Sequence, residues 1–399
     1  MAANAGLLPA VRQVQARWRR IRYERSVARF LRDRDGRAER LPAGLVYEAA
    51  KRCSIGCELR DANDPARVEG NGREELDLSA LDRALPAQHG LQVNLAGGEI
   101  FVRKDIREVF TLLRSKGYAC GYLTTNGACI DEAHADGLAR LAADGFLRHV
   151  SVSVDGPEDL PDGARGVPAT FARTAAGLRR LRAAANRLGA PLRISINASV
   201  ARESLESLDE IVDVADELGV HTIGLNHLMY ATPQEVDDTL RILGEADPSP
   251  ISTFVTRDPG VRPGRVRAKV AALASRCRAR GILFDYRPKV HPELLDAYYA
   301  PGAPLHGRCL YPFLNTTVSS TGKMYFCPFI RVEVGDVTET PLEESWNGKR
   351  YVELRRRLLH HGLFPVCRRC CKVELTPAVA ERSPDIAAAP GRVSPAAVG

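Results

Sequence analysis

The sequence predicts an α/β protein built around parallel β-strands, and three observations lead to this fold class. Short runs of β-branched and apolar residues alternate with longer stretches of helical periodicity. Six such strand–helix units follow one another, an order typical of a parallel sheet with right-handed crossovers. Polar residues or glycines follow each predicted strand, where such proteins bind their ligands. The pattern fits either an open doubly wound sheet or part of a barrel.

The composition describes a globular chain of 399 residues, 45% of them apolar and 26% charged. No stretch approaches the roughly 18 uninterrupted apolar residues that a membrane span needs. The N-terminus lacks the apolar block and the cleavage site of a secretory signal, so we expect a cytoplasmic protein. The net charge of +7 is spread along the chain and therefore does not indicate a nucleic-acid partner.

The first predicted element is a basic amphipathic helix within residues 1–42. Its apolar residues recur at alternating steps of four and three, which places them on one stripe: Leu7, Val11, Val14, Trp18 and Ile21. An apolar stripe needs a surface to pack on. That surface is either the main domain or a partner or membrane.

Residues 43–290 form the predicted α/β domain. Its strand candidates are residues 45–49, 92–96, 119–124, 149–154, 192–198 and 222–226. Helices are predicted over residues 106–116 and 205–218. Prolines interrupt the stretch 231–300, where we expect a linker or lid containing one helix over residues 266–280.

Residues of chemical rather than structural character follow the predicted strands. They are Cys53 and Cys57, then Gly97-Gly98-Glu99, Thr125-Asn126-Gly127, Asp155-Gly156-Pro157, Asn197 and finally Asn226-His227. The carboxyl ends of parallel strands meet at one edge of a sheet. Six separate segments are therefore expected to supply one site.

The segment from residue 300 to 375 carries a second group of reactive residues. In a reducing cytosol, clustered cysteines indicate metal or reactive chemistry rather than disulfides. Four thiolates suit zinc and an iron–sulfur cluster equally well by count, and Cys371 is a spare. The four candidate ligands are Cys309, Cys327, Cys367 and Cys370. Residues 376–399 hold Pro, Ala and Ser without periodicity, so we expect a disordered tail.

The segment Lys51–Arg60 resembles the cluster loop of the radical S-adenosylmethionine (radical SAM) enzymes. In that family the loop reads Cys-x3-Cys-x2-Cys, and its three thiolates hold a four-iron cluster whose open iron chelates S-adenosylmethionine. Cys53 and Cys57 match the first two cysteines, but the third position is Arg60. A guanidinium stays protonated and offers only donors, so Arg60 cannot replace the missing ligand.

The resemblance covers about residues 43–375 and implies a partial (β/α)6 TIM-type barrel. It implies that the glutamate of the Gly-Gly-Glu element accepts a hydrogen bond from the amino group of the methionine moiety. The two glycines would let the backbone approach this ligand. Ser153 would lie near the ribose, Arg165 would face the ligand carboxylate, and Asn197 with Asn226-His227 would border the adenine or the substrate. The implied cofactor-binding residues are Gly97, Gly98, Glu99, Asn126, Ser153, Arg165 and Asn197.

The C-terminal segment is similar to the SPASM or twitch extension of the same family. That extension reads Cys-x(9–15)-Gly-x4-Cys and, after a gap, Cys-x2-Cys. Here twelve residues separate Cys309 from Gly322, and four more precede Cys327. No cysteine follows Cys371. The resemblance therefore implies a single auxiliary 4Fe-4S cluster, held by the four candidate ligands.

The resemblance implies an enzyme that abstracts hydrogen from an organic substrate and passes an electron to the auxiliary cluster. The result would be oxidation, epimerisation or cross-linking of a small metabolite or peptide in a biosynthetic pathway. A flavodoxin or ferredoxin would supply the reducing electron. No leader-peptide-binding domain is visible before residue 43, which favours a small metabolite.

Arg60 leaves three outcomes open. Another group, such as Glu58, Asp61 or an incoming thiol, completes the first cluster. Alternatively, the loop holds S-adenosylmethionine without a cluster, and Arg60 faces its carboxylate. In the third outcome the chain is a non-catalytic binding or partner protein that keeps only the auxiliary cluster.

Overall fold

The fold is described from a computed structural model, in which residues 33–38, 40–53, 75–87, 91–154, 170–248 and 251–376 are placed. Several sequence predictions lie outside the described residues. They are most of the N-terminal helix, the tail, Cys57, Arg60, Asp155-Gly156-Pro157 and Arg165.

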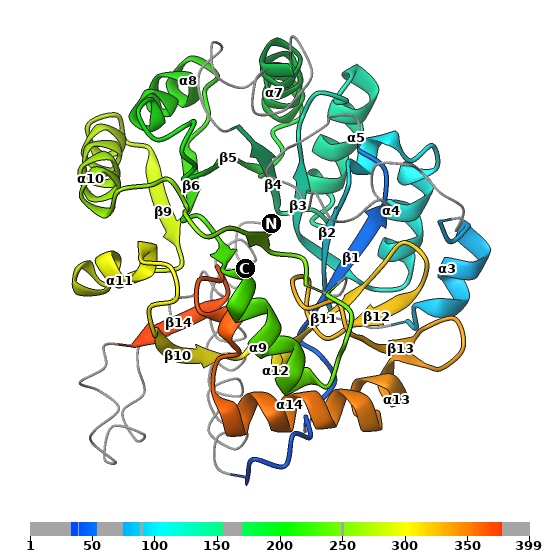
Figure 1. Cartoon of the computed structure of the whole chain (residues 1–399). Coiled ribbons are helices and arrows are strands. Elements are labelled where there is room, and N and C mark those ends of the chain that lie inside the picture. Colours follow the sequence, from blue (N-terminus) through cyan, green and yellow to red (C-terminus); the bar gives the residue numbers. More distant parts are fainter. Residues whose placement is uncertain are drawn as a thin grey trace, which may run out of the picture.

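One ten-stranded sheet forms the centre of the described structure, in the order β13-β12-β11-β1-β2-β3-β4-β5-β6-β9. Seven of its strands pair in parallel from β1 to β9, and the sheet curves into a partial barrel (Figure 1). This confirms the predicted α/β fold class. The seven strands are β1 (Gly44–Ala50), β2 (Gln92–Gly97), β3 (Ala119–Thr125), β4 (His149–Ser153), β5 (Arg193–Ser199), β6 (Thr222–Asn226) and β9 (Leu283–Arg287).

Helices cover the outer face of this curved sheet (Figure 1). They include α3 (Leu78–Ala84), α4 (Ile106–Ser115), α5 (Glu132–Ala143), α7 (Thr170–Arg187), α8 (Ile211–Glu217) and α10 (Pro263–Ala279). In α4 the buried residues Ile106, Val109, Phe110 and Leu113 recur at helical spacing, so one apolar face packs on the sheet.

The inner wall of the barrel is polar. On β4, Val150 and Val152 are fully buried in the apolar core, whereas the residues that alternate with them are His149, Ser151 and Ser153. Successive side chains of a strand point to opposite faces, so these polar groups line the inner face. A closed (β/α)8 barrel fills its interior with bulky branched side chains. The polar wall here suits a bound ligand instead.

The segment 231–300 is not the linker or lid that its prolines predicted. The predicted helix exists as α10, but β9 then joins the main sheet beside β6, with Gly224 opposite Asp285. Two further helices, α9 (Pro233–Leu243) and α11 (Leu295–Tyr299), belong to the same segment. The α/β pattern therefore continues for one more unit.

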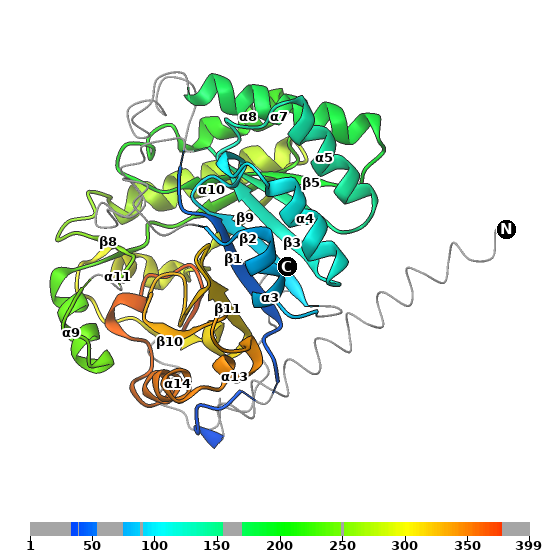
Figure 2. The same ribbon diagram turned by 90° about the vertical axis from the view of Figure 1, so that its right-hand side faces the viewer.

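The C-terminal segment shares the main sheet with the barrel. β11 (Asn315–Val318) pairs in parallel with β1, and β12 (Lys323–Tyr325) and β13 (Glu333–Asp336) extend the sheet in antiparallel fashion. A separate antiparallel pair joins β10 (His306–Cys309) to β14 (Val373–Thr376) and brings the two ends of the segment together. Figure 2 shows these elements with α13 (Leu342–Trp346) and α14 (Lys349–His361), gathered away from α7 and α8.

The chain preceding β1 runs along α13 and α14. Asn347 exchanges two hydrogen bonds with the backbone of Ala38, at 2.9 and 2.7 Å, and the Trp346 indole donates to the carbonyl of Arg40 at 2.7 Å. The buried Arg355 guanidinium lies 4.0 Å from the Trp346 ring centroid. These contacts fix the entry of the chain into β1.

Candidate functional site

The Gly-Gly-Glu turn after β2 packs directly on the chain that leads from β1 to Cys53. The Gly98 amide donates to the carbonyl of Ala50 at 2.7 Å, and the Glu99 amide donates to that of Arg52 at 2.8 Å. A Cβ atom at Gly98 would lie only 1.9 Å from the Arg52 oxygen. The expected approach of a ligand to these glycines stays a prediction. Their lack of a side chain admits the neighbouring backbone.

Glu99 ties the end of β2 to the end of β3. Its carboxylate is fully buried and accepts hydrogen bonds from the Phe101 amide (3.2 Å), the Thr125 hydroxyl (2.8 and 2.9 Å) and the Asn126 amide (2.7 Å). A carboxylate offers about four acceptor sites. Most of this capacity is used within the protein, and the predicted bond to the ligand's amino group stays a prediction.

Asn126 and Cys53 meet at the same edge of the sheet. The Asn126 side-chain nitrogen lies 3.9 Å from the Cys53 sulfur, and the Asn126 oxygen accepts a hydrogen bond from the Ala128 amide at 2.9 Å. The Thr174 hydroxyl also donates to the Asn126 carbonyl at 2.8 Å. The first predicted cluster ligand therefore lies against a side chain held in place by α7.

The next strands continue this edge. In the sheet register Ser153 lies opposite Asn197, and Asn226 lies opposite Arg287. The Asn226 amide donates to Asn197 at 3.2 Å. Among the described residues, the structure thus brings Cys53 next to Asn126 and places Ser153, Asn197 and Asn226 at neighbouring strand ends. The roles of Cys57 and Arg165 stay predictions, because both lie outside the described residues.

His227 is part of the core and does not border the rim, contrary to the prediction. Its side chain is 2% exposed, and its Nδ1 shares a hydrogen bond of 2.8 Å with the hydroxyl of Tyr299. The rings of Tyr286 and Tyr298 pack around it. Burial lowers the pKa of His227 to about 4, so this imidazole is neutral at pH 7.

All four predicted cysteine ligands of the C-terminal segment line one cavity. Cys309 ends β10, Cys327 follows β12, and Cys367 and Cys370 belong to the turn formed by η4 (Pro365–Cys367). The cavity measures about 460 Å³, part of it open to solvent. Residues more than 60 positions apart in the sequence therefore converge, as the Cys-x2-Cys spacing alone could not show.

The chemistry of these thiols calls for a cationic centre. Burial raises the pKa of Cys309 to about 12 and that of Cys327 to about 11, and it raises the pKa of Cys367 well above its usual value. Nearby thiols add to the shift of Cys309 and Cys367. Four thiolates in this cavity are therefore costly unless positive charge compensates them, and bound metal provides that charge.

Zinc and a four-iron cluster place different demands on the spacing of the thiols. Within the described ranges, no three His, Cys, Asp or Glu side chains lie close enough to bind one metal ion. A tetrahedral zinc with Zn–S bonds of about 2.3 Å needs sulfurs about 3.8 Å apart. A four-iron cluster binds each thiolate through a different iron, so the cysteine sulfurs around it lie farther apart than around one zinc ion.

Cys371 does not line the cavity. A hydrogen bond from Cys370 lowers the pKa of the Cys371 thiol, and the positive charges of Lys372 and Arg287 act in the same direction. Lys372 does line the cavity, and it also interacts electrostatically with Tyr122 on β3 and with Arg287 at the end of β9. The cavity is therefore adjacent to the barrel.

Two ion pairs, one partly and one fully buried, were not found from the sequence. Arg331, four residues after Cys327, forms a two-pronged bridge to Glu48 of β1 at 2.7 and 2.9 Å. Arg369, inside the Cys-x2-Cys turn, pairs with Glu235 of α9 at 2.8 Å. The sequence could have predicted the second pair, because a buried charge at Arg369, between two candidate cluster ligands, requires an opposite charge nearby.

Comparisons with known proteins agree with this arrangement. Residues 309–371 match the SPASM family, an iron–sulfur cluster-binding domain. The chain is 27% identical over 317 residues to an AdoMet-dependent heme synthase of Methanosarcina barkeri, with 79% of this chain and 85% of that protein aligned. It is 23% identical over 308 residues to an AdoMet-dependent heme synthase of Nitratidesulfovibrio vulgaris, covering 76% and 78%. A PqqA peptide cyclase of Ruegeria pomeroyi is 30% identical over 186 residues, or 46% of each chain.

Solved structures share the fold. Streptococcus suis SuiB bound to the precursor peptide SuiA superposes with a TM-score of 0.58 at 16% identity, covering 83% of this chain and 70% of that one. Native anSMEcpe with bound AdoMet gives a TM-score of 0.54 at 15% identity, covering 78% and 82%. None of the helices in the described ranges is both long and apolar enough to cross a membrane.

Proposed function

Because the chain belongs to the radical SAM proteins that carry a C-terminal SPASM domain, we propose that it is a biosynthetic oxidoreductase that removes hydrogen from a small organic molecule. The observation that supports this most is the closeness of two sites. A cavity lined by four thiols lies next to a polar barrel wall, and Lys372 interacts with groups of both. An electron released from a substrate in the barrel would have a short path to the cavity.

In this proposal, two separate sets of residues bind two cofactors. When bound, S-adenosylmethionine with its cluster supplies hydrogen abstraction, and the auxiliary 4Fe-4S cluster accepts an electron. Cys53 and Cys57 would hold the first cluster. Asn126, Ser153 and Asn197 would contact S-adenosylmethionine, while Arg165 would face its carboxylate. The auxiliary ligands would be Cys309, Cys327, Cys367 and Cys370.

Glu99 and the two glycines beside it have a supporting part in this proposal. Glu99 fixes the ends of β2 and β3 at the edge where Cys53 and Asn126 meet. Gly98 lets that edge close on the backbone of Arg52. The polar inner wall would orient the substrate by hydrogen bonds, and the apolar layer behind it would keep the strands rigid.

A small molecule is the substrate class we propose. Two relatives aligned over more than three quarters of this chain are named heme synthases, whereas a PqqA peptide cyclase aligns over 46% of it. Tetrapyrroles are therefore the first substrates to test, and the precursor peptides of cyclases are the second. Flavodoxin or ferredoxin would supply the reducing electron.

The direct test is cleavage of S-adenosylmethionine. Anaerobically reconstituted protein, incubated with S-adenosylmethionine and dithionite, is expected to release 5′-deoxyadenosine, and Cys53→Ala protein is not. Arg60→Cys restores the usual three-cysteine loop and is expected to raise the yield. The absence of 5′-deoxyadenosine above background with two different reductants, for both wild type and Arg60→Cys, would refute catalysis.

A second candidate function rests on Arg60 at the third ligand position. In it the chain binds a substrate or a partner and keeps only the auxiliary cluster. Iron analysis separates the two candidates. About four irons per chain, lost in Cys309→Ala but unchanged in Cys53→Ala, would support the binding protein, and about eight irons would support the enzyme.

A further inference from the structure

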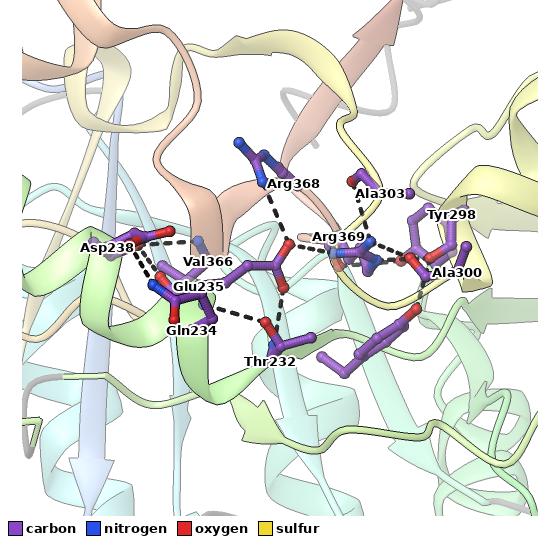
Figure 3. A network of polar contacts seen from close by, with 12 residues as sticks. Thr232, Gln234, Glu235, Asp238, Tyr298, Ala300, Ala303, Val366, Arg368 and Arg369 are labelled. Carbon is purple, nitrogen blue, oxygen red and sulfur yellow. Dashed lines mark hydrogen bonds and ion pairs between the residues drawn. The ribbon is translucent and has the colours of Figure 1, made fainter.

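The Cys-x2-Cys turn that supplies two cavity thiols contains a buried arginine. Arg369 has a fully buried side chain, and its Nε donates to the carbonyl of Tyr298 at 2.7 Å. Its Nη2 donates to the carbonyl of Ala300 at 2.7 Å, and its guanidinium lies 4.7 Å from the centroid of the Tyr230 ring. These contacts tie the turn to the chain around α11 (Figure 3).

Glu235 neutralises this arginine from the start of α9. Its carboxylate is 4% exposed and accepts from Arg369 Nη1 at 2.8 Å. Its other oxygen accepts from the Thr232 amide at 2.9 Å, which completes the capping box of α9 (Figure 3). The same helix holds the turn a second time, because the Thr239 hydroxyl accepts from the Val366 amide at 3.1 Å.

The geometry demands an arginine at this position. The planar guanidinium donates in three directions at once, to a carboxylate and to two backbone carbonyls at the end of α11, those of Tyr298 and Ala300. A lysine would keep the charge but would reach fewer of these acceptors. Loss of either partner would leave an uncompensated buried charge, which is strongly destabilising.

The two charges of the pair lie at different distances from the thiols. Arg369 lines the cavity, whereas Glu235 does not. A charge beside an iron–sulfur cluster changes its reduction potential, since added positive charge favours the reduced and more negative state. Glu235 therefore offsets a positive charge that would otherwise act on the cluster.

We propose that Glu235 and Arg369 are positioning residues for the auxiliary cluster. The pair holds the Cys367–Cys370 turn in its ligating shape, and its charge balance sets the reduction potential of the cluster. This inference rests on the proposed function only in assuming that the auxiliary cluster binds. It does not depend on cleavage of S-adenosylmethionine.

The experiment uses the full chain in a Cys53→Ala/Cys57→Ala background, so that iron reports on the auxiliary cluster alone. Glu235→Gln is expected to raise the potential, measured by redox titration with electron paramagnetic resonance, because Arg369 loses its counter-charge. Arg369→Met is expected to lower it, because the carboxylate remains. Arg369→Lys keeps the charge and is expected to retain the wild-type potential but to lose iron to a chelator about 10–100-fold faster.

Arg241→Met is the matched control. Arg241 belongs to the same helix α9 as Glu235, but its side chain is 70% exposed, it pairs with Asp238, and it does not line the cavity. Its replacement is expected to leave potential and iron retention nearly unchanged. Potentials that are unchanged, or that shift in the same direction in Glu235→Gln and Arg369→Met, would overturn the electrostatic part. Wild-type iron retention in Arg369→Lys would overturn the positioning part, and absence of iron in the background protein would instead refute the auxiliary cluster itself.

Discussion

Replacing Thr125 by valine should reveal how strongly the rim of the barrel depends on Glu99. The Thr125 hydroxyl donates to both oxygens of the Glu99 carboxylate, at 2.8 and 2.9 Å, and accepts from the Gly127 amide at 2.9 Å. Thr125 is 2% exposed and Glu99 is fully buried, so water cannot replace the lost partner. Valine keeps the shape of threonine and removes only the hydroxyl.

The expected loss follows from these contacts. A hydrogen bond to a charged group contributes about 1.5–3 kcal/mol, and the unpaired Gly127 amide costs about 1 kcal/mol more. The free energy of unfolding of Thr125→Val should therefore fall by about 3 kcal/mol. Affinity for S-adenosylmethionine should also fall, because the Asn126 amide donates to the same carboxylate at 2.7 Å.

Urea unfolding of the cofactor-free protein in anaerobic reducing buffer, followed by circular dichroism, measures the change. Thr111→Val is the matched control, because Thr111 is exposed on α4 and its hydroxyl donates only to the carbonyl of Arg107 within its own helix. The control should stay within about 0.5 kcal/mol of wild type. If the free energy of unfolding of Thr125→Val lies within about 1 kcal/mol of that of Thr111→Val, the hydrogen bonds from Thr125 do not stabilise the Glu99 carboxylate.

Three further predictions follow from other contacts. Gly98→Ala places a Cβ atom 1.9 Å from the backbone oxygen of Arg52, so it should lower the urea midpoint and weaken S-adenosylmethionine binding in equilibrium dialysis; wild-type values for both would contradict the close approach. Burial lowers the pKa of His149 and of His227 to about 4, so the unfolded state binds more protons between pH 6.5 and 4 and stability falls as the pH drops through this window. At pH 5 each of the two histidines lowers the free energy of unfolding by up to about 2 kcal/mol relative to pH 7. Equal urea midpoints at the two pH values would contradict buried neutral imidazoles. Cys309→Ala should remove about four irons per chain, and an unchanged iron content would exclude the cavity as the auxiliary site.

The predicted strands agree closely with the structure because each combines a β-rich run with a following helix. The prediction 222–226 matches β6, and the prediction 119–124 ends one residue before β3 does. β9 escaped prediction because its five residues, Leu-Phe-Asp-Tyr-Arg, lie within a proline-rich stretch and include two charges. Only its pairing with β6 makes this segment a strand, and sequence periodicity does not contain that information.

The site was predictable as a set of residues but not as a set of contacts. Parallel topology alone places Ser153 and Asn197 on neighbouring strand ends. It does not show that Gly98 packs closely on the carbonyl of Arg52. The position of His227 could not be predicted for the same reason. A histidine beside a strand end can lie at the rim or pack in the core against tyrosine rings, as His227 does.

The boundary between the barrel and its cysteine-rich extension shows best what tertiary structure adds. The sequence indicates two domains, yet β11 pairs with β1 from Gly44 opposite Asn315 to Tyr47 opposite Val318. β1 leads within three residues to Cys53, and β11 lies between the two halves of the cavity segment. A change in the separation of the two cysteine sites would have to break this ladder and the Glu48–Arg331 bridge. Because the ladder and the bridge join the extension directly to β1, the two cysteine sites are held at a fixed separation, and regulation by relative movement of two domains is disfavoured.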